Sequence, residues 1–297
     1  MSKPILTTLE LIKHMENKGI TFNYESIADA QKVLDTRNYY FKLASYRTMF
    51  PKGSDGKYAN LDFAYLEDLA SIDGQLREYL LELTLDIEHG IKTFLISLIS
   101  SEPNEDGYSI VEEYKKRFST QYTVTLNQLG HNAYFKDMYR KYHDEMPIWV
   151  LMEVISFGTL SQFVEFYFEK YQYKKLKQIK SHLKFCKNIR NACAHSNPFL
   201  VNIFSEKEFI PRPSAAIISV ADTMNISREY IKDVKINDLV STFYFHKKFQ
   251  SSQLKDHRIR EGKRLLKRFD RHSTWYAENQ KINTFIAILR LLVDYLE

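Results

Sequence analysis

A short polar segment, Arg190-Asn191-Ala-Cys-Ala-His195, combines residue types that can cleave a phosphodiester bond. A neutral imidazole at His195 can take the proton from an RNA 2′-hydroxyl, and a protonated one can supply a proton to the leaving 5′-oxygen. The Arg190 guanidinium can neutralise charge that builds on the phosphate, and Asn191 can orient the phosphate or the imidazole. This chemistry needs no metal or cofactor, and use of the 2′-hydroxyl restricts it to RNA.

The same residues also have a plainer interpretation. An arginine four to six residues before a histidine occurs by chance about once in a chain of this composition, so the spacing alone is weak evidence. His195 is then a helix-terminal or core histidine, and Arg190 is a member of a structural ion pair.

A helix predicted over residues 174–195 must position these groups. Its apolar stripe is formed by Leu176, Ile179, Leu183, Cys186 and Cys193. Asn191 and His195 are one turn apart and share a face with Lys177, Lys180 and Lys184. Arg190 projects toward the apolar stripe, where an unpaired guanidinium is costly. We therefore expect it to meet a carboxylate, a backbone cluster, a cleft or a subunit seam.

Positive charge is concentrated in two segments, although the whole chain carries only +5. Residues 170–190 hold eight basic residues and no acid, and residues 246–272 have a net charge of +7. Focused positive charge suits a polyanion, and the alternative is a pair of solvated amphipathic helices. The predicted RNA-binding residues are Lys177, Lys180, Lys184, Lys187, Lys247, Lys248, Arg260, Lys263, Arg264, Lys267 and Arg268.

The composition predicts an all-α protein, because only 9 glycines and 7 prolines are available for turns in 297 residues. Thr7 and Glu10 have capping-box spacing, and residues 62–100 form one helix or two that meet near Gly74. Further helices are predicted over 125–143, 227–248, 252–269 and 276–296, with a capping-box start at Thr159 and Gln162 and an irregular crossing over 196–223. The sequence shows no zinc-ligand cluster, signal peptide or membrane span, so we expect a cytoplasmic protein.

The segment before this helix carries a carboxylate in apolar surroundings. Glu153 lies within Trp149-Val-Leu-Met-Glu153-Val-Ile, and a carboxylate there should pair with a cation, either Arg190 or a lysine. Trp149 and Phe157 are expected in the core. We assign Glu153 a supporting role as an ion-pair partner rather than as a proton donor.

Two blocks carry a resemblance to a known family. Arg190, Asn191 and His195 match the Arg-Asn-x-x-x-His motif of HEPN ribonucleases, and Pro147 to Ser161 resembles the block that precedes it in bacterial Abi-like proteins of the AbiD/AbiF type. Asn38-Tyr39-Tyr40 and Ile87-Glu88 are similar to that family too. The resemblance extends to about residue 199, and no motif is matched beyond residue 200.

The resemblance implies a HEPN-like helical bundle with an N-terminal helical subdomain and C-terminal helices. We divide the chain into the subdomain 1–60, the HEPN-like core 61–200 and a basic helical region 201–297 packed on it. The family further implies a homodimer with paired motifs, and metal-independent RNA cleavage in anti-phage defence, in some members restrained by a small non-coding RNA. The alternatives are a non-catalytic RNA-binding protein of a toxin–antitoxin or defence complex, and a helical adaptor for a phage or host protein.

Overall fold

The protein is mainly helical, as seen in a computed structural model that describes residues 4–205, 209–210 and 212–297. Residues 1–3, 206–208 and 211, which belong to the predicted N- and C-terminal segments, lie outside the described part. The all-α prediction is confirmed. The exception in this part of the chain is a parallel pair of two-residue strands, β1 (Ile20–Thr21) and β2 (Leu61–Asp62), with Ile20 opposite Leu61.

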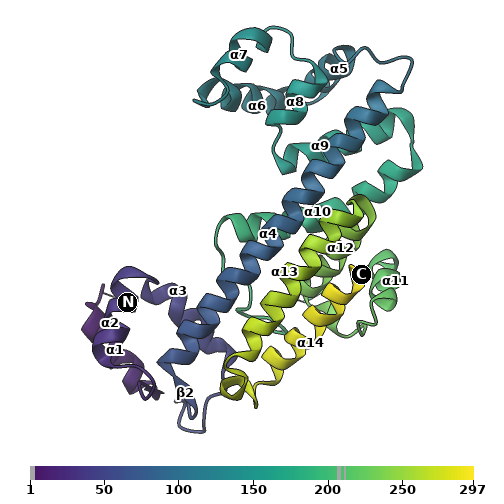
Figure 1. Cartoon of the computed structure of the whole chain (residues 1–297). Helices are drawn as coiled ribbons and strands as arrows, with labels where there is room; N and C mark the ends of the chain where they lie inside the picture. The colour runs from purple at the N-terminus through teal and green to yellow at the C-terminus, as the bar shows by residue number, and fades with distance from the viewer. Residues whose placement is uncertain (1–3, 206–208, 211) are drawn as a thin grey trace.

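One long helix, α4 (Phe63–Ser100), is the axis of the molecule (Figure 1). Its 38 residues run without interruption past Gly74, which settles the choice between one helix and two. At 1.5 Å per residue the helix is about 57 Å long. The Asp62 carboxylate caps its start by accepting the Ala64 N–H, and it also accepts bonds from Thr21 and Asn23. This one side chain thereby ties the N-terminal segment to the axis.

The N-terminal helices are α1 (Thr8–Asn17), α2 (Ile27–Thr36) and α3 (Tyr40–Ser45), which lie at the first end of α4 (Figure 1). The capping box predicted for the first helix is confirmed. Thr7 accepts the Glu10 N–H, and the Glu10 carboxylate accepts the Thr7 N–H.

The other end of α4 carries a group of short helices (Figure 1). They are α5 (Ser109–Arg117), α6 (Ser119–His131), α7 (Lys136–Tyr142), α8 (Ile148–Val154) and α9 (Phe157–Tyr171). The single helix predicted over 125–143 is wrong, because α6 ends at His131 and the next residue, Asn132, is extended. The start predicted at Thr159 is also wrong. Ser156 caps α9 instead by accepting the Thr159 N–H.

The last part of the chain returns along α4 (Figure 1). It consists of α10 (Lys174–Ala194), α11 (Ala215–Thr223), α12 (Val234–Phe249), α13 (Ser252–Asp270) and α14 (Gln280–Tyr295). Helix α10 begins beside the second half of α4, and α13 and α14 lie beside its first half. The crossing predicted as irregular contains α11. The helix predicted from residue 227 begins only at Val234, because the Asp233 side chain accepts two N–H groups there and stops any earlier start. The last helix begins at Gln280 rather than at 276, after a 3₁₀ turn over Ser273–Tyr276.

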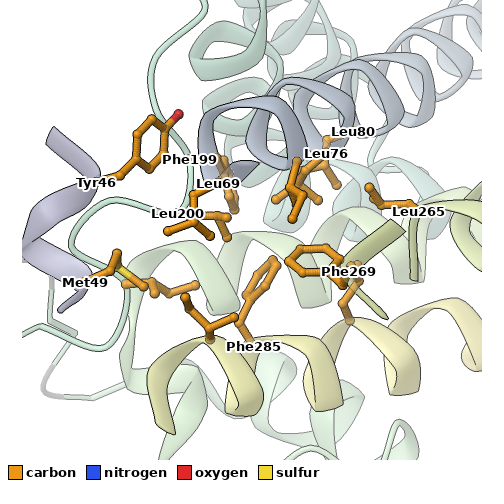
Figure 2. Packing of buried hydrophobic residues seen from close by; sticks show 14 of the residues in the cluster. Tyr46, Met49, Leu69, Leu76, Leu80, Phe199, Leu200, Leu265, Phe269 and Phe285 are labelled. Atoms are coloured by element: carbon orange, nitrogen blue, oxygen red, sulfur yellow. The ribbon is translucent and has the colours of Figure 1, made fainter. Parts of the chain in front are cut away.

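The buried apolar side chains form two cores along the axis. The first core joins α4 up to Leu83 with the N-terminal helices, the end of α10 and α11–α14 (Figure 2). The second core joins α4 from Ile87 onward with α5–α9 and the first part of α10. The first core crosses both predicted boundaries, near residues 60 and 200, and the second crosses the boundary near residue 200 through Phe245. The three-segment division therefore stays a prediction.

Candidate functional site

The site is built on α10, which, like α4 and α12, contributes described residues to both cores. Its predicted apolar stripe is confirmed, since all five members are buried. Leu176 to Cys186 lie in the second core, and Ile189 and Cys193 lie in the first. Burial raises the pKa of both thiols to about 12, so the cysteines serve as small apolar side chains.

Arg190 occupies an unusual position at the edge of the core. Its side chain is partly buried, its Nη1 donates to Oδ1 of Asn191 at 3.3 Å, and its buried Nε has no hydrogen-bond partner. No carboxylate among the described residues lies within ion-pair distance of it. A buried N–H without a partner costs roughly 1–3 kcal/mol, which makes this guanidinium a ready donor for an anion that reaches it.

His195 stands at the exposed end of α10, where the helix closes in a Schellman motif. Ser196 adopts a left-handed conformation with φ of 54°, and the Asn197 N–H returns to the Ala192 carbonyl oxygen at 2.9 Å. The imidazole is thereby presented to solvent. Arg190 and His195 are five residues apart, which is about 7.5 Å along the axis and about 140° around it. Neither side chain is sealed from water, and helical geometry places the two residues on different sides of α10.

A buried aspartate on α4 fixes the chain that follows His195. Asp73 accepts the backbone N–H groups of Phe199 and Leu200 at 2.7–3.1 Å, accepts the Tyr46 hydroxyl at 2.7 Å and pairs with Arg77. Figure 2 shows Tyr46 beside Phe199 and Leu200. Burial raises the pKa of Asp73, and these donors oppose that effect.

Asp73 and its partners were missed in the sequence. The available signal was a charged residue on the apolar face of the long helix, between the buried Ile72 and Leu76. A buried carboxylate needs several donors, and here two of the donors come from more than 120 residues away. No local pattern identifies such donors.

Glu153 and Trp149 differ from their predicted positions. Helix α8 has only seven residues and buries Ile148, Leu151 and Met152, so positions 149 and 153 share its outer face. Glu153 is exposed and its side chain has no hydrogen bond or ion pair with any described residue, so the predicted ion pair with Arg190 or a lysine is wrong. The Trp149 side chain is 49% exposed and packs edge-on against Tyr108 rather than in the core. Phe157 is buried, as predicted.

The predicted lysines of α10 lie along its outer face. Lys177 and Lys184 are exposed, whereas Lys180 pairs with Glu165 of α9 at 2.5 Å. Lys187 is partly buried against the start of α9, since a β-carbon built at Gly158 would lie 3.9 Å from its Cδ. The block around Gly158 and the block that ends in His195 thus lie side by side, although about 30 residues separate them in the sequence.

The predicted C-terminal RNA-binding residues divide into two sets. Four of them have partners within the protein: Lys247 with the Tyr295 carbonyl oxygen, Lys248 with the Tyr244 hydroxyl, Lys263 with Glu297 and Arg268 with Asp68. The other three, Arg260, Arg264 and Lys267, are exposed and have no hydrogen bond or ion pair within the described part of the chain.

The described residues contain no group of three or more His, Cys, Asp or Glu side chains placed to hold a metal ion. None of their helices is long and apolar enough to cross a membrane.

A comparison with known protein families finds a match over the region that contains this site. Residues 32–200, more than half of the chain, match the family model of the Abi-like proteins. No curated protein matches the chain, and no solved structure does. The matched region ends just after the motif and includes α3 to α10, so α11–α14 lie outside it.

Proposed function

Since the chain belongs to the Abi-like family, which indicates a role in abortive infection, we propose that it is a metal-independent HEPN endoribonuclease of anti-phage defence. We further propose that it acts in the cytoplasm as a toxin restrained by a small RNA. The observation that carries the proposal is that one end of α10 bears both an exposed imidazole and a guanidinium whose buried Nε lacks a partner.

The proposed reaction uses these groups directly. His195 takes the proton from a 2′-hydroxyl, whose oxygen attacks the adjacent phosphorus while the bond to the 5′-oxygen breaks. A protonated imidazole supplies the proton that the leaving 5′-oxygen needs. Arg190 binds the phosphate oxygens as their charge rises, and Asn191 holds the guanidinium through the bond to Nη1. Lys177 and Lys184 hold the RNA backbone along α10.

A second copy of the chain completes the site in this proposal. Because Arg190 and His195 point about 140° apart around α10, one phosphate is reached most directly by the motifs of two protomers facing each other. A two-fold axis near the end of α10 would bring the paired motifs into one cleft. We therefore propose that the active form is a homodimer.

The decisive experiment compares His195→Ala with the unchanged protein in a cleavage assay on RNA with a chelator present. Loss of a general acid–base group lowers the rate by about 10²–10⁴-fold. The fold should be unaffected, because the imidazole is exposed. His131→Ala is the matched control, since His131 is another exposed histidine at a helix end. Cleavage by purified His195→Ala at the normal rate would refute the assignment.

The second candidate function is RNA binding without catalysis. The exposed lysines of α10 favour it, because they attract a phosphate backbone whether or not His195 reacts. It predicts an RNA affinity that falls steeply with salt, together with no cleavage under any condition. Retained RNA binding by a protein that never cleaves would select this candidate.

A further inference from the structure

The cations of α13 are divided between two faces of that helix. Toward the core, Arg258 bonds to Glu82 and Asp86 of α4, and Arg268 pairs with Asp68 of the same helix. These arginines neutralise the largely buried carboxylates of Asp86 and Asp68. They are committed to the fold and are not free to bind a ligand.

The opposite face carries a second set, which we call the outer stripe. Its members follow one another at intervals of four, three and four residues, so they fall within about 60° of arc over about 16 Å of helix. All are exposed, and their side chains form no hydrogen bond or ion pair within residues 4–205, 209–210 and 212–297. They are Arg260, Arg264, Lys267 and Arg271.

The chemistry of the stripe favours a polyanion over a membrane. A basic amphipathic helix binds a membrane by inserting its apolar face between lipids. In α13 that face is formed by Leu265, Leu266 and Phe269, which are buried in the first core. The outer stripe therefore offers charge without an apolar anchor. Like charges in a row, with no ion pair to a described carboxylate, suit a chain of phosphates.

We propose that the outer stripe of α13 is a binding site for the phosphate backbone of RNA, separate from the cleavage site at the end of α10. This inference rests on the proposed function, because RNA is the polyanion with which that function places the protein in contact. The stripe belongs to the part of the chain that follows the family match, which ends at residue 200. The stripe supplies affinity for RNA, while the end of α10 supplies the groups that cleave it.

The test replaces Arg260, Arg264, Lys267 and Arg271 by alanine together, in the His195→Ala protein so that cleavage does not interfere. Alanine is the best helix former, so α13 remains folded. Affinity for a fluorescein-labelled RNA hairpin should fall about tenfold or more. The log–log dependence of affinity on salt should become less steep by about 3, because four phosphate contacts are lost. A matched control replaces Lys13, Lys32, Lys116 and Lys136, four exposed lysines on other helices, and should leave the affinity nearly unchanged.

Further variants and a vesicle-binding assay distinguish RNA binding by the stripe from the alternatives. Replacing the three arginines of the stripe by lysine should retain most of the affinity, because a phosphate backbone reads charge rather than side-chain geometry. Equal losses in the alanine variant and the scattered control would overturn the inference. So would a loss of binding to phosphatidylserine vesicles without a loss of RNA binding. If His195→Ala still cleaves RNA but the stripe variant loses affinity, the proposed active site fails and the stripe stands.

Discussion

Arg258 on α13 and Arg190 on α10 are both arginines at the edge of the buried interior, and their surroundings are opposite. Arg258 is 8% exposed, and its guanidinium donates to Asp86 at 2.7 Å, to Glu82 at 2.9 Å and to Glu261 at 2.7 Å. Burial raises the pKa of Asp86, but the bonds from His246 and Arg258 outweigh this and hold the pKa below its ordinary value. Arg258 is thus saturated by carboxylates.

Arg190 has one amide contact, to Asn191, and a buried Nε that is unsatisfied. The comparison shows that one basic segment can contain arginines with different roles. An arginine whose donors are all used by carboxylates serves the fold, whereas an arginine held near solvent with unused donors has free energy to gain from an anion. The difference lies in the partners, not in the residue type.

The largest expected effects come from replacing each of these two arginines by alanine and comparing stability with RNA cleavage. Arg258→Ala leaves Asp86 and its neighbours without their cation and should lower the free energy of unfolding by about 3–5 kcal/mol. Arg190→Ala should change stability by less than about 1 kcal/mol, since no ion pair is lost. It should lower RNA cleavage by about 10²–10³-fold. Urea unfolding and single-turnover cleavage of both variants measure the four quantities.

A large loss of stability in Arg190→Ala would contradict this comparison, because it would mean that Arg190 has a structural partner. Arg258→Met is the control for shape, since it retains much of the buried volume but not the charge.

The second prediction concerns Asp73, which binds the chain that follows the end of α10. Asp73→Ala removes the acceptor of the Phe199 and Leu200 N–H groups and the partner of Tyr46 and Arg77. We expect a loss of about 2–4 kcal/mol in unfolding free energy. We also expect faster hydrogen exchange at the amides of residues 199 and 200. Asp222→Ala, an exposed aspartate paired with Arg228, is the control and should cost less than about 1 kcal/mol. Unchanged exchange at these amides would show that Asp73 does not position the segment.

The smallest predicted effect is a pH dependence at the contact between α10 and α12. Burial raises the pKa of Asp238 to about 7, although Asn188 of α10 and Asn237 donate to its carboxylate. Between its unfolded pKa near about 4 and its folded pKa, this group binds more protons in the folded state than in the unfolded state. Raising the pH through this window therefore lowers the free energy of unfolding.

Asp238→Asn removes that titration. Compared with the unchanged protein, the variant should gain at least about 1 kcal/mol in relative stability between about pH 4.5 and about pH 8. Urea unfolding at the two pH values measures the difference. If the two proteins keep the same difference in stability at both values, Asp238 does not titrate in this window.

Local patterns in the sequence determined the helical class and much of the local structure. The scarcity of glycine and proline, the periodicity of residues 63–100 and the capping box at Thr7 each depend on neighbours within a few residues. The apolar stripe of α10 is predictable for the same reason. The helix that was wrongly continued through Asn132 shows the limit, because an apolar period can continue across a break in the backbone.

Only the tertiary structure decided which charges are used within the protein and which remain available. The sequence treats Arg258, Arg260 and Arg190 alike as members of basic segments. Yet two of the three carboxylates that bind Arg258 lie 172 and 176 residues away on α4. The donors that hold Asp73 are similarly remote. Helical periodicity is a short-range property of the backbone, whereas the pairing of buried charges depends on which distant helix packs opposite them.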